Sequence, residues 1–219
     1  MQKESKQKRI DRTGIIFSKL VEEFPDAHCA LNYNSPLELL IATILSAQCT
    51  DKNVNRVTRN LFLKYRCARD YAESSLEELS EDIRSIGLYR AKAKNIRLAC
   101  QSLLENHDGQ VPASMKSLIE LAGVGRKTAN VVLGNIFGIN EGVVVDTHVG
   151  RIVQLLGLTT EDNPVKIERD LIALVPEVDR TMFSHVLIEH GRKTCVANRP
   201  RCQACVVSEN CFYYLRQKK

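Results

Sequence analysis

Residues 121–134 read LAGVGRKTANVVLG. Its two glycines, Gly123 and Gly125, interrupt a pattern that is helical on both sides. Glycines this close together let the backbone turn sharply and approach a ligand, and the free N–H groups that start the second helix favour an anion such as a DNA phosphate. An ordinary turn between two helices explains the same glycines equally well.

The stretch also resembles a nucleotide-binding loop, but two features argue against that interpretation. A Walker A loop needs glycine immediately before Lys-Thr, whereas Arg126 stands there. The preceding segment, MKSLIELA, has a helical pattern, and a dinucleotide-binding fingerprint would require a strand there and a third glycine. The glycines are therefore interpreted as a helical hairpin.

Helical signals recur along the rest of the chain. Two segments begin with an N-cap serine that is followed three residues later by glutamate: Ser35 with Glu38, and Ser75 with Glu78. Gly87 is expected to end the helix that follows Ser75. The one extended candidate is the short run VVVD at 143–146. An all-α protein is therefore predicted, with further helices at about 10–24, 51–65, 90–106, 114–121, 127–137, 147–156, 164–175 and 179–191.

Composition limits the class of protein. The chain has 219 residues, 44% of them hydrophobic, which is enough for one large or two small domains. No segment approaches the roughly 18 to 20 consecutive apolar residues that cross a bilayer, and the basic N-terminus is followed by no apolar signal region. A cytoplasmic protein with no membrane association is expected. The net charge of +5 allows an acidic partner without demanding one.

The eight cysteines fall into two groups. Four are scattered through the first half of the chain and are expected to be reduced, small hydrophobic residues. The other four crowd a loop-like stretch near the C-terminus: Cys195, Cys202, Cys205 and Cys211. Four thiolates fit zinc or an iron–sulfur cluster, and the single C-x2-C pair with wide spacings on either side favours the larger cluster.

Two residues could carry chemistry. Lys127 is in the first turn of a predicted helix, where the macrodipole should make its amine lose a proton more easily, and a neutral amine can form a Schiff base. Asp146 follows the apolar run GVVV and is expected to be the N-cap of the next helix. It could also stabilise a cationic sugar transition state and handle protons beside Lys127. A solvated lysine and a simple cap are the alternatives.

In combination, LAGVGRKTA, VVVDTH, LSAQCTD, IGLYRAKAKNI and C-x6-C-x2-C-x5-C resemble endonuclease III, a bifunctional DNA glycosylase with a helix-hairpin-helix motif. The resemblance covers nearly the whole chain. It implies a six-helix barrel over 29–139, with the helix-hairpin-helix at about 114–137. It also implies a discontinuous iron–sulfur cluster domain formed by 1–28 and 140–219, with DNA in a cleft between the two domains.

The resemblance also implies a mechanism. A damaged pyrimidine is flipped from duplex DNA, Lys127 attacks the sugar carbon, and β-elimination cuts the strand 3′ to the abasic site. Asp146 matches the catalytic aspartate, Gln48 the residue that fills the space of the flipped base, and Leu88 the wedge in the opposite strand. The four C-terminal cysteines match the ligands of a [4Fe-4S] cluster with a structural role. Predicted DNA contacts are Gln48, Leu88, Gly123, Gly125, Arg126, Thr128, Arg192 and Lys193.

The predicted partner is double-stranded DNA that contains damaged pyrimidines or abasic sites, bound by a monomer at the nucleoid. Two other functions stay open. One is a monofunctional glycosylase acting on another base, and the other is a DNA-binding or electron-transfer protein without glycosylase activity. Lys127 together with Asp146 favours the bifunctional enzyme, because a binding module needs neither residue. The sequence does not rank the damaged bases.

Overall fold

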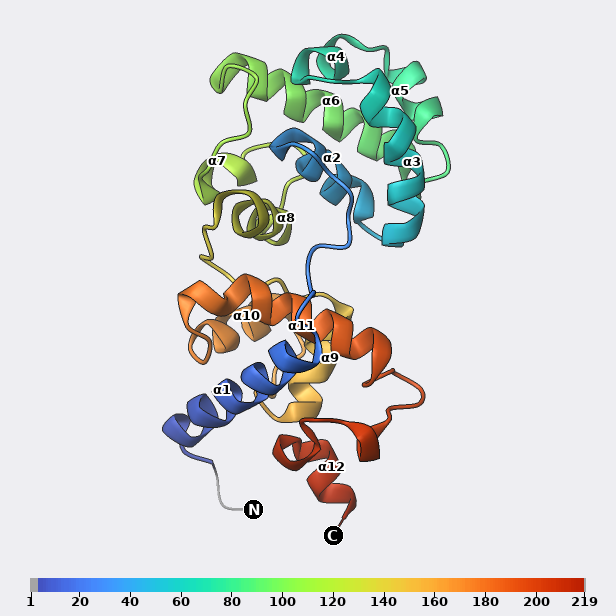
Figure 1. The fold of residues 1–219 in the computed structure, drawn as a ribbon. Coiled ribbons are helices and arrows are strands. Elements are labelled where there is room, and N and C mark those ends of the chain that lie inside the picture. The colour runs from blue at the N-terminus through green and yellow to red at the C-terminus, as the bar shows by residue number, and fades with distance from the viewer. Residues whose placement is uncertain (1–3, 219) are drawn as a thin grey trace. The chain divides into compact units, whose positions relative to one another are not determined.

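The structure is a computed structural model that describes residues 4–218. Within that range every regular element is helical, so the predicted all-α fold is confirmed. The chain divides into a central unit, Cys29–Ile139, and a terminal unit that joins the chain up to His28 with the chain from Asn140 onward (Figure 1). The outermost residues of the predicted discontinuous domain, 1–3 and 219, lie outside the described residues.

The central unit packs its helices around one that is almost wholly buried. The side chains of α2 from Leu39 to Leu45 are all buried, and α2 contacts α3, α6 and α8. Ser35 caps this helix by accepting a hydrogen bond from the N–H of Glu38, and Pro36 occupies its first turn. The helices of this unit are α2 (Pro36–Ser46), α3 (Asp51–Lys64), α4 (Ala68–Glu73), α5 (Leu76–Asp82), α6 (Tyr89–Asn106), α7 (Met115–Ile119), α8 (Arg126–Val132) and the π-helical turn η1 (Leu133–Phe137).

The terminal unit brings the first helix of the chain against its last third. Ile16 and Leu20 of α1 are fully buried in one apolar cluster with Val149 and Phe183. Figure 1 shows the blue α1 beside the orange α11, which it contacts. The helices of this unit are α1 (Lys6–Glu23), α9 (Thr147–Leu156), α10 (Pro164–Ile172), η2 (Glu177–Asp179), α11 (Arg180–Lys193), η3 (Cys202–Ala204), η4 (Ser208–Asn210) and α12 (Phe212–Gln217).

The structure corrects the predicted end of one helix. Ser75 caps α5 as expected, but the helix ends at Asp82 and not at Gly87. Ile83 and Ile86 are both buried, and the N–H of Ile86 bonds to the carbonyl of Ile83, so tight turns carry both side chains into the core. The chain thereby reaches α6 through non-helical backbone, and Leu88 is the N-cap of that helix.

Two short helices, α4 and α12, were not predicted from the sequence. Each has six residues and follows a cysteine in place of a typical N-cap residue, so the sequence carries no start signal for it. Tyr71 of α4 stacks on Tyr65 with ring centroids 4.8 Å apart, so tertiary packing fixes this helix. None of the helices between residues 4 and 218 combines the length and the apolar composition that crossing a membrane requires.

Candidate functional site

The two glycines of the hairpin between α7 and α8 have different roles. Gly123 has a positive φ of 77°, and a Cβ there would lie 2.9 Å from side-chain atoms of Asn95 on α6. The fold therefore requires glycine at this position. Gly125 has a φ of −94°, and a Cβ there would meet nothing within 4 Å. No contact inside the described structure explains the second glycine, which faces open space.

The residues after the turn point their charges outward. Arg126 and Lys127 form the first turn of α8 and are exposed, while Thr128 is half-buried. Ala129 and Val132, further along the same helix, are fully buried, and they anchor α8 against the core of the central unit. The lysine is thus displayed on the solvent-facing side of a helix whose other side is fixed.

Asp146 is the N-cap of α9, as predicted. Its Oδ1 accepts a hydrogen bond of 2.8 Å from the N–H of Val149, and its side chain is half-buried. The buried Val143 and Val145 hold the backbone that leads to it. Lys127 belongs to the central unit and Asp146 to the terminal unit, and their pairing stays a prediction.

Gln48 and Leu88 share an unusual backbone conformation. Both lie in the central unit and have a positive φ, 54° and 59° respectively, a backbone conformation that residues other than glycine rarely adopt. Both side chains are exposed, and Leu88 keeps 62% of its surface accessible. An isolated exposed leucine is common, and Asp108 also has a positive φ of 51°, so the roles of Gln48 and Leu88 stay predictions.

The four clustered cysteines surround one pocket of the terminal unit. The pocket is partly open to solvent and is lined by all four together with apolar residues such as Leu156 and Val207. All four are free thiols and half-buried: Cys195, Cys202, Cys205 and Cys211. Burial raises the pKa of the Cys205 thiol to about 11, which favours the neutral form in the absence of a cation.

This donor set fits the cluster predicted from the sequence. Four thiols on one pocket are the ligands that an iron–sulfur cluster takes, and none of them is consumed in a disulfide. Between residues 4 and 218, no group of three or more His, Cys, Asp or Glu side chains is arranged around a single metal ion. Arg151 donates to Cys195 Sγ at 3.7 Å, and Cys211 Sγ lies 3.5 Å from the carbonyl of Leu155. The Arg151 contact can orient a thiolate ligand, whereas the Cys211 contact needs the thiol proton, which ligation removes.

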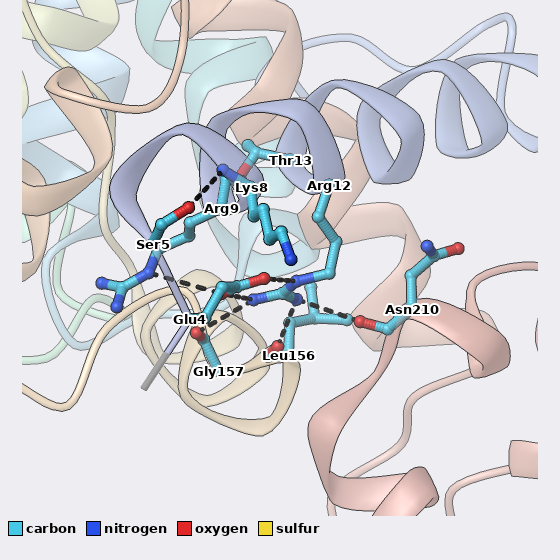
Figure 2. Close-up of polar contacts among 9 residues, drawn as sticks. All are labelled: Glu4, Ser5, Lys8, Arg9, Arg12, Thr13, Leu156, Gly157 and Asn210. Atoms are coloured by element: carbon cyan, nitrogen blue, oxygen red, sulfur yellow. Dashed lines mark hydrogen bonds and ion pairs between the residues drawn. The ribbon is translucent and has the colours of Figure 1, made fainter. Parts of the chain in front are cut away.

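Arg12, which the sequence analysis missed, fastens this pocket to α1 (Figure 2). Its guanidinium donates to the carbonyls of Leu156, Gly157 and Asn210 at 2.7, 3.2 and 3.0 Å. It also makes a two-pronged ion pair with Glu4 at 2.8 and 2.9 Å, and this hydrogen bonding lowers the pKa of Glu4. No local pattern could reveal these partners, because Asn210 is 198 positions away.

Two predicted DNA contacts at the end of α11 are engaged within the protein. Glu189 pairs with Arg192 at 3.3 Å and with Lys193 at 3.1 Å. Both cations are exposed, and exposed ion pairs of this kind are weak, so a phosphate could compete for them. Their role in DNA binding stays a prediction.

With this geometry in place, comparison with known proteins identifies the class. Residues 41–177 match the HhH-GPD superfamily of base excision DNA repair proteins. Endonuclease III from Synechocystis sp. is 49% identical over 207 residues, which cover 94% of this chain and 93% of that protein. Endonuclease III from Bacillus subtilis (strain 168) is 46% identical and covers 88% of each chain.

A solved structure agrees with these relatives. It is described as a trapped endonuclease III–DNA covalent intermediate and superimposes with a TM-score of 0.90 at 42% identity, covering 99% of this chain and 100% of its own. The chain belongs to the endonuclease III family. It is accordingly a DNA glycosylase and abasic-site lyase of base excision repair, and the enzyme class predicted from the sequence is confirmed.

Proposed function

We propose that Lys127 is the nucleophile of this glycosylase and lyase. The observation that supports this role is its exposed place in the first turn of α8, two residues after Gly125, where a Cβ would meet nothing within 4 Å. Its Nζ, after loss of one proton, attacks C1′ of the damaged nucleotide. The bond from C1′ to the pyrimidine breaks, and the base leaves with the electron pair and takes up a proton.

The same intermediate leads to strand cleavage. Loss of one Nζ proton and cleavage of the C1′–O4′ bond, in which O4′ keeps the electron pair and takes up a proton, open the sugar ring and leave a protonated imine between Lys127 and C1′. This imine makes the C2′ hydrogens acidic. Removal of one of them expels the 3′ phosphate with its electron pair by β-elimination, and water then releases the enzyme. Asp146 stabilises the positive charge on the sugar and transfers protons, which suits a half-buried carboxylate held by the helix that it caps.

Recognition is assigned to residues of both units. The substrate is duplex DNA with an oxidised pyrimidine or an abasic site, bound by a monomer in the cytoplasm at the nucleoid. Gln48 fills the space of the flipped base, and Leu88 wedges into the opposite strand. The open space at Gly125 leaves room for a DNA phosphate, because a side chain there would meet nothing of the protein itself. Remaining phosphate contacts are assigned to Gly123, Arg126, Thr128, Arg192 and Lys193.

The cluster is assigned a structural role. A [4Fe-4S] cluster held by Cys195, Cys202, Cys205 and Cys211 would fasten a segment whose only helices between residues 194 and 211 are two single turns, η3 and η4. Metal binding of this kind contributes directly to folding. The purified protein is expected to contain about four irons per chain, as a cluster of this type requires. Stoichiometric zinc in place of iron would overturn the assignment.

Borohydride trapping tests the nucleophile. Reduction during turnover of a duplex with an oxidised pyrimidine should fix the imine as a covalent adduct at Lys127. Lys127→Gln should still bind DNA and give neither adduct nor cleavage. The matched control is Arg126→Gln, which removes a charge from the adjacent exposed position and should weaken binding while the adduct still forms. A wild-type enzyme that excises the base without an adduct would be monofunctional.

A further inference from the structure

The two segments that carry Gln48 and Leu88 are fastened to each other. Gln48 follows α2, and Leu88 caps α6. Between these segments, a Cβ at Gly87 would lie 3.7 Å from the carbonyl oxygen of Gln48, so the two backbones are almost in van der Waals contact. Two polar side chains then bridge them, and neither belongs to the residues assigned to DNA or chemistry above.

Lys92 is the first bridge. Its side chain is only 5% exposed, and its Nζ donates to the carbonyls of Leu45 and Ala47 at 2.8 and 2.6 Å. These carbonyls are at the C-terminal end of α2, where helices lack partners for their last carbonyls and a cation is favoured. The backbone N–H of Lys92 bonds to the carbonyl of Leu88 at 3.0 Å. One residue thus holds the neighbour of Gln48 through its side chain and Leu88 through its main chain.

Asn53 on α3 is the second bridge. Its Nδ2 donates to the carbonyl of Ser85 at 3.0 Å and contacts Cys49 Sγ at 3.3 Å. Its Oδ1 accepts from Arg56, whose guanidinium also donates to the Ser85 hydroxyl at 2.9 Å. The segment after Gln48 and the segment before Leu88 are therefore also tied together through α3.

We propose that Lys92 and Asn53 are positioning residues that hold Gln48 and Leu88 as one rigid, two-pronged element. This inference rests on the roles proposed above for Gln48 and Leu88. Both prongs have strained backbone, which persists only where the surroundings determine it. Two flexible loops would each have to be ordered when they enter the duplex, whereas a pre-formed pair avoids that cost and enters as a unit.

Hydrogen exchange of the free protein tests the coupling itself. Lys92→Met and Asn53→Ala should each accelerate amide exchange in both segments, 47–50 and 85–88, because local opening then breaks fewer contacts. Lys94→Met is the matched control, since it removes a charge from an exposed position on the same helix and should leave both segments unchanged. Acceleration confined to one segment would show that the prongs are independent and would overturn the proposal.

Single-turnover excision tests the consequence for the reaction. One duplex carries the lesion in a normal base pair, and the other carries it opposite a mismatched base, which costs less to flip. Loss of the rigid pair should slow excision from the paired duplex by about tenfold or more and affect the mismatched duplex several-fold less. Equal losses on both duplexes would indicate a general structural defect and would overturn the positioning role.

Two further variants keep the result decisive. If Lys92→Met does not fold, Asn53→Ala carries the test, because Asn53 is only half-buried, and Lys92→Arg should restore part of the paired-duplex rate. Gln48→Ala is measured in parallel. If Gln48→Ala slows excision equally on both duplexes, the proposed role of Gln48 is wrong. The hydrogen-exchange result still decides whether the two segments are coupled.

Discussion

The guanidinium of Arg12 lies 4.2 Å from the ring centroid of Phe212, the residue that follows Cys211. The same guanidinium bonds to the carbonyl of Asn210, the residue that precedes Cys211. A cysteine proposed as a cluster ligand is therefore held on both sides by one side chain of the first helix.

Arg12→Met should release iron to a chelator at least about tenfold faster than the wild-type protein, because residues that position metal ligands affect affinity by that order. The control is Arg9→Met, since Arg9 reaches the same Glu4 at 3.6 Å but is more exposed. Iron release is measured by a colorimetric assay in the folded holoprotein. Arg12→Lys should be intermediate, because lysine cannot reproduce the fork of donors. Equal release from the Arg9 and Arg12 variants would contradict the prediction.

Substitutions of the two hairpin glycines should have different effects, on stability at Gly123 and on DNA binding at Gly125. Gly123→Ala should lower the free energy of unfolding by roughly 1–3 kcal/mol, because it combines positive φ with a contact of 2.9 Å to Asn95. Gly125→Ala should leave stability unchanged, since its Cβ meets nothing, yet weaken binding to duplex DNA. Urea unfolding and a binding titration at fixed salt measure the two effects. Undiminished affinity of Gly125→Ala would show that this glycine approaches no phosphate.

Two substitutions of Asp146 should separate its effect on base release from its effect on stability. Asp146→Asn can still accept the hydrogen bond from Val149, so it should cost little stability while slowing base release by about 10² to 10⁴. Asp146→Ala loses the cap as well and should unfold more easily by about 1 kcal/mol. Single-turnover excision and thermal unfolding of both variants distinguish the two contributions. If Asp146→Asn releases the base as fast as the wild-type enzyme, Asp146 acts only as a helix cap.

Acid should weaken the terminal unit through His185. Burial lowers the pKa of this imidazole from 6.5 to about 4, with His28 lowering it further and Glu189 opposing the shift. As the pH falls below about 6.5 the unfolded state takes up the proton first, so stability is lost until about pH 4. The contribution is on the order of 2 kcal/mol, and His185→Gln should flatten that part of the stability profile in urea unfolding. An unchanged slope in the variant would assign the pH dependence elsewhere.

Local patterns predicted what depends on neighbouring residues. Ser35, Ser75 and Asp146 were recognised as caps because a cap and its helix adjoin in sequence. The stop at Gly87 was wrong because burial of Ile83 and Ile86 ended the helix earlier, and that burial depends on packing. The hairpin was recognised, but only the tertiary structure distinguishes Gly123, where a Cβ would clash with Asn95, from Gly125, where it would meet nothing.

Hydrogen-bond partners that lie far apart in the sequence could not be predicted from it. Lys92 and Arg12 look like ordinary surface cations, yet one is buried against α2 and the other bonds to carbonyls more than 140 positions away. A signal for Lys92 was present. It falls in register with Ile96, Ala99 and Leu103 on the apolar face of α6, where a lysine requires a partner.

The packing of α1 against α11 has a consequence for synthesis on the ribosome. Residues 29–139 form a contiguous segment that can fold as soon as it emerges. Ile16 and Leu20 are made early, whereas Phe183 and Leu187, which share their apolar cluster, are made after the whole central unit. At typical translation rates this leaves the apolar face of α1 uncovered for roughly ten to thirty seconds. A nascent chain stalled in that interval should bind a chaperone through α1, and release should follow completion of α11.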